Sequence, residues 1–163
     1  MEARVYKPVY DELILRTRFL TEKLIKTTSR DLPRTEKFQM GGSRNMRGYA
    51  FEAIGPTISA VDETTKETRI FNSGGQLSVL TTFELEHPLI KEAGLKWVLF
   101  YDAGNVFEDA DGINGEYPLR QDYGFGFRWF SPIGVLRFEF GYPIDPEEGQ
   151  EGQQFHFDIG QLF

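Results

Sequence analysis

The stretch that decides the fold is Gln76–Glu86, QLSVLTTFELE, in which apolar and polar side chains alternate. One face carries Leu77, Val79, Thr81, Phe83 and Leu85. The other face carries Gln76, Ser78, Leu80, Thr82, Glu84 and Glu86. A period of two residues predicts a β-strand with one apolar and one polar face.

The same alternation recurs on both sides of this stretch. We expect further strands at Glu12–Leu20, Leu95–Val106, Asp122–Trp129, Leu136–Tyr142 and Gln154–Phe163. The chain therefore contains about six antiparallel strands, each near the ~9–11 residues of a tilted membrane-spanning strand. Their connections alternate between short and long, which is typical of outer-membrane barrels.

Two architectures fit this alternation: a soluble antiparallel β-sandwich and a transmembrane β-barrel. Aromatic residues make up 15% of the chain and dominate the apolar faces, whereas glycines and charges of both signs occupy the polar faces. An aromatic face suits lipid and a polar face suits a wet lumen, so the pattern favours the barrel. The mean hydropathy of −0.39 does not argue against it, because alternating strands have low average hydropathy.

About six strands cannot enclose a barrel, since membrane barrels begin at about eight strands. A lone sheet in lipid would leave two edges of unpaired backbone groups. We therefore expect that this chain is the C-terminal piece of a longer barrel. The alternative is that several copies of the chain associate to close a barrel. Its first residues, Met1–Arg4, lack the apolar segment of a signal peptide, which fits a piece of a longer protein or a cytosolic protein.

Several functional classes are disfavoured by composition. The chain has no cysteine, and His87 and His156 lack ligand spacing, so we expect no metal site and no cofactor. A net charge of −7 argues against nucleic-acid binding. No catalytic constellation is present, so we expect no enzyme. The run Asp109–Gly112 fails the spacing of a calcium loop and is interpreted as solvated loop.

A long connection of about residues 21–74 carries the densest motif in the chain, Gly41–Tyr49, GGSRNMRGY. Its glycines permit tight turns, so the motif predicts a compact loop that presents Arg44 and Arg47. An ordinary basic surface loop is the plain alternative. Connections of this length are usually functional or disordered.

Four motifs resemble the BamA family of outer-membrane assembly and translocation proteins. They are Gly41–Tyr49 with Ile54-Gly55-Pro56, Phe100–Val106, Ser131–Gly134 and the C-terminal Phe155–Phe163. The motif order is kept over nearly the whole chain, with Met46 as a mild departure. The resemblance implies an all-β, antiparallel transmembrane β-barrel, of which residues 1–163 form about the last six of sixteen strands.

The resemblance also implies a function and a location. The chain would belong to an integral protein of the bacterial outer membrane that folds and inserts β-barrel proteins without covalent chemistry. Implied partners are outer-membrane lipids, nascent β-barrel proteins, assembly-machinery lipoproteins, and the missing N-terminal strands and POTRA domains. Alternatives are a translocation subunit of the TamA or two-partner secretion type, and a soluble β-sandwich with a binding role.

Two sets of site residues follow from the resemblance. The extracellular loop motif Arg47, Gly48 and Tyr49 would fold into the lumen, where Arg47 pairs with Glu84 and Asp102. The alternative is that Arg47 is solvated and both acids pair elsewhere. The C-terminal strand, about residues 153–163, would pair weakly with the first strand of the barrel and form a lateral seam that can open, so we call it the gate strand. Its outer face would carry the pattern by which this barrel is itself assembled: Phe155, Phe157, Ile159 and Phe163.

Gly160 in that strand would allow a kink, since glycine in a strand often marks a bend. The alternative is that Gly160 only relieves crowding inside the barrel.

Overall fold

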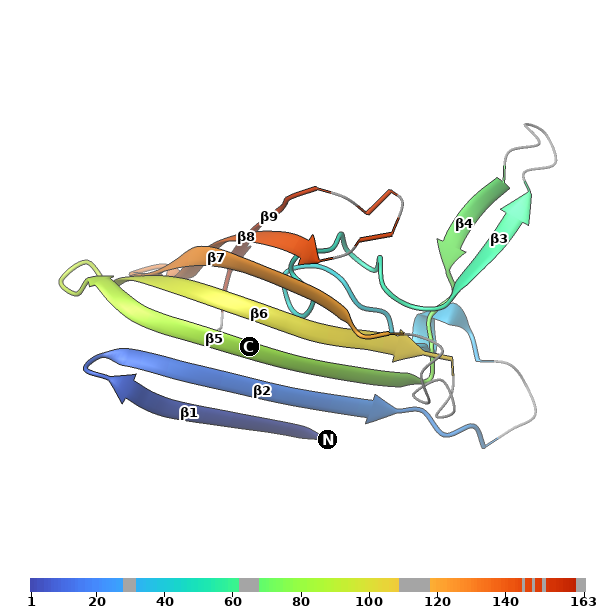
Figure 1. Ribbon diagram of the computed structural model, residues 1–163, viewed down its shortest axis with the longest axis horizontal. Helices are drawn as coiled ribbons and strands as arrows, with labels where there is room; N and C mark the ends of the chain where they lie inside the picture. Colours follow the sequence, from blue (N-terminus) through green and yellow to red (C-terminus); the bar gives the residue numbers. More distant parts are fainter. Residues whose placement is uncertain are drawn as a thin grey trace.

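The computed structural model describes residues 1–27, 32–61, 68–108, 118–144, 146–147, 149–150 and 152–160. Seven antiparallel strands form one curved sheet in the order β1-β2-β5-β6-β7-β8-β9 (Figure 1). Their bounds are β1 Glu2–Tyr10, β2 Leu13–Lys23, β5 Leu77–Ile90, β6 Leu95–Phe107, β7 Arg120–Ser131, β8 Gly134–Ile144 and β9 Gln154–Ile159. A separate hairpin is formed by β3 Thr57–Val61 and β4 Thr68–Asn72, and one 3-10 turn spans Arg34–Glu36.

The sheet has one strand more than the approximately six expected. The additional strand is β1, which pairs with β2 from Glu2↔Leu20 to Tyr10↔Leu13. Every residue of β1 is exposed, and its pairing register shifts between Pro8 and Tyr10. Proline has no N–H to donate and is tolerated at a sheet edge, so this edge strand has a weaker sequence signal than the inner strands.

The two faces of the sheet are those predicted from the alternation. On β7 the residues Tyr123, Phe125, Phe127 and Trp129 are exposed, whereas the residues between them are buried. Aromatic rings line up across neighbouring strands on the exposed face, with 5.2 Å between Phe125 and Phe140 and 5.0 Å between Phe140 and Phe155. Within the described residues no second sheet covers these rings, so the soluble sandwich is wrong.

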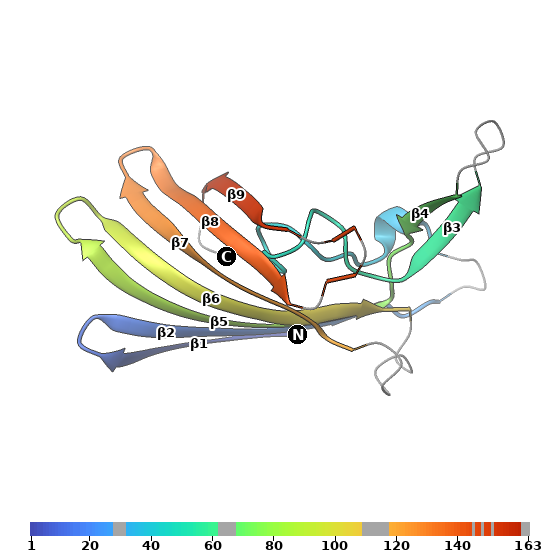
Figure 2. The same ribbon diagram turned by 45° about the horizontal axis from the view of Figure 1, so that its top comes forward.

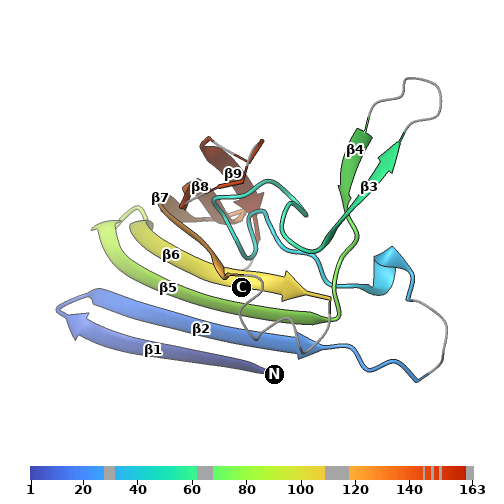
Figure 3. The ribbon, with the colours of Figure 1, turned by 45° about the vertical axis from the view of Figure 1, so that its right-hand side comes forward.

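Short and long connections lie at opposite ends of the sheet (Figure 2). Short turns at residues 11–12, 91–94 and 132–133 join β1 to β2, β5 to β6 and β7 to β8. The longest connection runs from residue 24 to residue 76, close to the predicted 21–74. This connection contains the β3–β4 hairpin, which was not among the predicted strands and projects away from the sheet (Figure 3).

The core lies between this loop and the concave face of the sheet. Met40, Met46, Tyr49, Ile54, Leu80 and Val106 pack together there, each at most 2% exposed. Backbone bridges Phe38↔Gly75 and Met40↔Ile54 hold the two arms of the loop together. No helix in the described parts of the chain is long and apolar enough to cross a membrane.

Candidate functional site

The loop motif folds tightly because two glycines adopt backbone angles that other residues avoid. Gly41 has φ of 115° and Gly42 has φ of 104°. The amide of Gly42 donates to the carbonyls of Met46 at 3.1 Å and Tyr49 at 3.0 Å. A Cβ on Gly41 would lie 2.1 Å from the carbonyl oxygen of Ala50. The compact loop predicted from the glycines is therefore present.

Arg47 projects from this loop onto the inner face of the wall and is 2% exposed. Its Nε and Nη2 donate to Oδ2 and Oδ1 of Asp102 at 2.8 and 2.9 Å, a bidentate pairing. Its Nη1 donates to Oε1 of Glu84 at 2.6 Å. The structure therefore brings Arg47, Glu84 and Asp102 together, and the alternative of a solvated Arg47 is wrong.

The guanidinium of Arg47 remains charged in this environment. Burial lowers the pKa of Arg47, but the negative charges of Asp102, Glu84 and Glu139 outweigh burial and hold that pKa well above its ordinary value. The Cζ atom also lies 3.6 Å from the centre of the Phe100 ring, which adds a cation–π contact. The loop is thus held by one fixed positive charge.

The ion pairs extend well beyond the three residues expected from the sequence. Arg128, which is 0% exposed, pairs with Glu84 at 2.7 Å and with Glu139 at 3.0 Å. Further pairs are Arg128 with Glu86 at 3.1 Å, Arg16 with Glu86 at 2.9 Å and with Glu84 at 3.9 Å, Lys96 with Glu86 at 2.7 Å, Arg137 with Glu139 at 2.8 Å and Arg47 with Glu139 at 3.4 Å. We call these eight residues and Asp102 the lumenal cluster.

Sequence reasoning placed the strand residues Arg128, Arg137 and Glu139 on polar faces but did not assign them to the site. The detectable signal was charge of both signs at inward positions of β7 and β8. Those inward positions do not reveal which carboxylate each arginine reaches, because that depends on strand register. The structure pairs Gly126 with Glu139 and Arg128 with Arg137 across β7 and β8.

Gly48 and Tyr49 fix the loop against β7 and β8. A Cβ on Gly48 would lie 2.4 Å from Cβ of Asp122 and 2.9 Å from the backbone nitrogen of Pro143. The hydroxyl of Tyr49 lies 3.2 Å from the carbonyl oxygen of Gln121 and 3.3 Å from that of Ile144. Close approach at Gly48 is therefore a condition for Arg47 to reach its partners.

Of the expected gate strand at residues 153–163, the structure describes β9 over Gln154–Ile159, and residues 161–163 lie outside the described residues. Phe155, Phe157 and Ile159 are each more than half exposed on the outer face, and Phe163 lies outside the described residues. Gly160 has φ of 147°, and a Cβ there would meet nothing within 4 Å. The positive φ favours glycine at this position, and none of the described residues crowds it.

The loop also touches the C-terminal strand directly. Nε2 of His156 on β9 donates to the carbonyl oxygen of Arg47 at 2.8 Å. Within the described residues, no group of three or more His, Asp or Glu side chains is arranged to hold a metal ion. The site is therefore built to hold a loop between wall strands by charge and close packing.

Comparisons with known proteins identify the family. A family model described as the Omp85 superfamily domain matches residues 1–163. The chain is 29% identical over 167 residues to the outer membrane protein assembly factor BamA of Nitratidesulfovibrio vulgaris, covering all of this chain and 20% of that protein. It is 26% identical over 161 residues to BamA of Neisseria meningitidis serogroup B, covering 83% of this chain and 20% of that protein.

A solved structure shows the same fold. The crystal structure of BamA from Haemophilus ducreyi lacking POTRA domains 1–3 matches with a TM-score of 0.77 and 24% identity, covering 96% of this chain and 33% of that chain. The chain spans about a fifth of the length of the curated relatives it matches. It belongs to the Omp85 superfamily and forms the C-terminal part of a β-barrel of the bacterial outer membrane.

Proposed function

We propose that this chain supplies the C-terminal wall and gate strand of an outer-membrane protein assembly factor. The complete protein folds and inserts β-barrel proteins through a lateral seam next to β9, and it does so without covalent chemistry. Its partners are nascent β-barrel proteins, outer-membrane lipids, assembly-machinery lipoproteins, and the N-terminal strands and POTRA domains that complete it. The curated relatives carry the name outer membrane protein assembly factor, which supports this class of function.

The observation that carries the seam is the contrast between β9 and the inner strands. Within the described residues, β8 and β9 pair over six positions, from Leu136↔Ile159 to Gly141↔Gln154, with one more backbone bond from Gly160 to Val135, whereas β7 and β8 pair over eleven positions. β9 ends at the bend of Gly160, and its other edge has no partner among the described residues. A strand with few ladder bonds separates from a neighbour at lower cost than a fully paired strand.

A free edge in lipid is unfavourable unless another strand pairs with it, because its N–H and C=O groups find no water there. A client strand can satisfy these groups by adding to the edge of β9. The lumenal cluster supports this mechanism by holding the loop, and with it β5, β6 and β8, in one fixed arrangement. The wall then stays rigid while the seam opens.

Site-specific crosslinking tests the proposal. A photoreactive residue replaces Phe157 on β9 or Phe125 on β7 in the complete protein, and a radiolabelled client barrel is supplied. Both positions are exposed phenylalanines on the outer face, but Phe125 lies on a strand that is paired on both sides. We expect client adducts at position 157 and about background at position 125. Equal adducts at both positions, or none at position 157 during active insertion, would contradict a seam at β9.

A further inference from the structure

A second cationic region lies on the inner side of the wall and adjoins the lumenal cluster, with which it shares Arg137. A cavity of about 320 Å³ is bounded by β1, β2, the loop motif, β8 and the end of β9. The residues that line it are Arg4, Arg18, Arg44, Arg137, Asp158, Ile159 and Gly160. Arginines outnumber carboxylates four to one in this lining. Several guanidiniums around one cavity favour an oxyanion such as phosphate, because each presents a planar fork of donors.

Neighbouring contacts hold three of these arginine side chains in place. The carboxylate of Glu2 pairs with both Arg4 at 2.8 Å and Arg18 at 2.7 Å. Arg18 also donates to the backbone carbonyl of Arg44 at 3.2 Å, which ties the loop to β2. Arg137 donates to the backbone carbonyl of Ser43 and to Glu139, both at 2.8 Å. The guanidiniums of Arg4, Arg18 and Arg137 are therefore pre-arranged at the cavity, and preorganised groups lose less entropy when a ligand binds.

Two buried atoms in the cavity lining lack a hydrogen-bond partner among the described residues. They are Nε of Arg137, on a residue that is 5% exposed, and Oδ2 of Asp158. Buried polar groups are almost always paired, so an unpaired one indicates a missing partner. The two atoms need opposite partners, since the guanidinium donates and the carboxylate accepts. An anion alone satisfies only the first of them.

We propose that this cavity binds a phosphate ester that carries a primary ammonium group, the phosphoethanolamine class. The phosphate lies against the arginines, and the ammonium donates to Asp158. Such a group occurs free and as a phospholipid headgroup. Ile159 and Gly160 of β9 and its end line the same cavity, and Ile159 is 61% exposed, so the cavity lies next to an apolar side chain at the end of the wall. Ligand binding here does not require client insertion, so its test can fail while the proposed function holds.

Calorimetry on the complete protein in a phosphate-free maltoside detergent tests the site with two probes, O-phosphoethanolamine and inorganic phosphate. We expect saturable binding that is tighter for O-phosphoethanolamine. Arg44→Gln should weaken both probes by about tenfold, the loss typical of one charge-assisted hydrogen bond. Asp158→Asn should remove the preference for O-phosphoethanolamine and leave phosphate binding in place.

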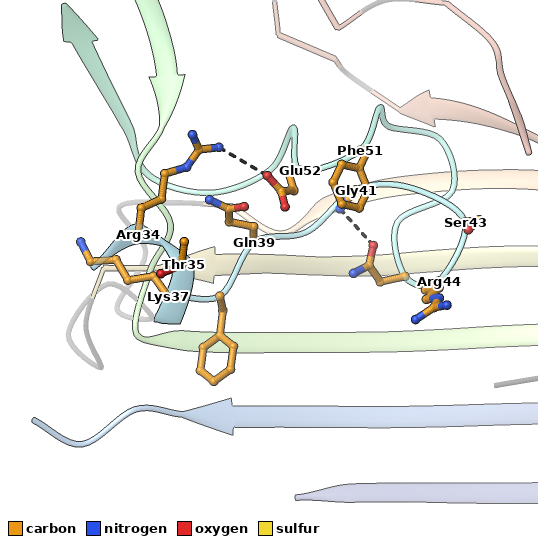
Figure 4. Close-up of a pocket in the computed structure, with 11 residues that line it drawn as sticks. Arg34, Thr35, Lys37, Gln39, Gly41, Ser43, Arg44, Phe51 and Glu52 are labelled. Atoms are coloured by element: carbon orange, nitrogen blue, oxygen red, sulfur yellow. Dashed lines mark hydrogen bonds and ion pairs between the residues drawn. The ribbon is translucent and has the colours of Figure 1, made fainter. Parts of the chain in front are cut away.

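Arg34→Gln is the matched control because it removes one positive charge from the same loop. Arg34 lines a different cavity of about 830 Å³ and points toward Glu52, with 3.4 Å between Nη2 and Oε2 (Figure 4). Binding in this variant should equal that of the wild type. Absence of saturable binding of both probes, or an equal loss in Arg34→Gln and Arg44→Gln at unchanged circular dichroism, overturns the proposal.

A second experiment identifies the source of the group. The complete protein is exposed to bilayers of phosphatidylethanolamine and phosphatidylcholine and then extracted, and retained lipid is measured by mass spectrometry. Preferential retention of phosphatidylethanolamine by the wild type, lost in Arg44→Gln, assigns a lipid headgroup, because quaternary choline cannot donate to Asp158. Saturable binding of O-phosphoethanolamine without retained lipid supports the site with a soluble ester as its ligand.

Discussion

The ring of His156 on the last strand lies 2.8 Å from the backbone carbonyl of Arg47, the residue whose side chain crosses to β5 and β6. One residue of the loop is therefore bonded on both sides, through its side chain to the middle of the wall and through its backbone to β9. This contact joins the loop to the strand at which we propose client insertion. Its loss should affect both elements without removing any charge from the lumenal cluster.

His156→Ala should therefore loosen the loop modestly. A neutral hydrogen bond contributes about 0.5–1.5 kcal/mol, so protection of the loop from added protease should fall roughly two- to tenfold. His156→Gln should restore much of the protection, because the glutamine amide can donate to the same carbonyl. Cleavage rates at residues 40–55 in the complete protein measure the effect, and identical rates in all three proteins would show that the bond is not used.

Replacement of Arg47 should have a much larger effect. Arg47→Gln leaves Asp102 without its bidentate partner in a buried position, and breaking a buried ion pair typically costs about 3–5 kcal/mol. We expect a lower urea midpoint, faster loop cleavage and reduced client insertion.

Asp102→Asn in the Arg47→Gln background should recover part of the loss, because it removes the stranded charge. Additive effects of the two substitutions in a double-mutant cycle would contradict direct coupling.

Because Arg47 stays charged at alkaline pH, we predict that the docking of its loop does not depend on pH between 7 and 9. The pKa of Arg47 is raised in the folded protein, so the stability it contributes is fully present below the already strongly alkaline pKa of the unfolded chain and is lost as pH rises through the folded pKa. Loop docking should therefore not weaken between pH 7 and pH 9 on account of this residue. Protease protection measured across that range should be flat, and a midpoint within it would show that another group controls docking.

Gly48→Ala tests the close packing of the loop. The added Cβ would lie 2.4 Å from Asp122 and 2.9 Å from the backbone of Pro143, so strand β7 or the loop has to shift. Such overpacking typically costs about 1–3 kcal/mol and would draw Arg47 away from Asp102.

Ser43→Ala is the control on the same loop, because Ser43 accepts the hydrogen bond of Arg137 through its backbone carbonyl. Loop cleavage should rise in Gly48→Ala and stay near wild type in Ser43→Ala. Equal cleavage in both variants would mean that the wall accommodates the methyl group.

The strands and their faces could be predicted because alternation is a local property. In Gln76–Glu86 the alternation assigns the neighbours Phe83 and Glu84 to opposite faces, and in the sheet Phe83 is exposed whereas Glu84 is buried. The pairing of Arg47 with Glu84 and Asp102 could be predicted only from the family resemblance, because no local sequence pattern links a loop residue to residues on two strands. Arg128 and Glu139 were missed because their partners depend on register and on how far the loop folds back. β1 was missed because an exposed edge strand with a proline has little amphipathic pattern.

Gly160→Ala tests the bend at the end of the gate strand. No atom of the described residues lies within 4 Å of an added Cβ there, so the expected cost comes from φ of 147°, which is about 1–3 kcal/mol for a residue other than glycine. The variant should straighten the end of β9, lengthen its pairing with β8, and slow client insertion into vesicles by the complete protein.

Gly152→Ala is the matched control for that substitution. Gly152 also has a positive φ, 110°, with nothing within 4 Å of an added Cβ, but it lies before β9 rather than at its end. Both variants carry a comparable backbone strain, so a general loss of stability should slow insertion in both. Slower insertion in Gly160→Ala alone would assign the effect to the bend beside the seam, whereas equal rates in the two variants would remove the bend from the mechanism.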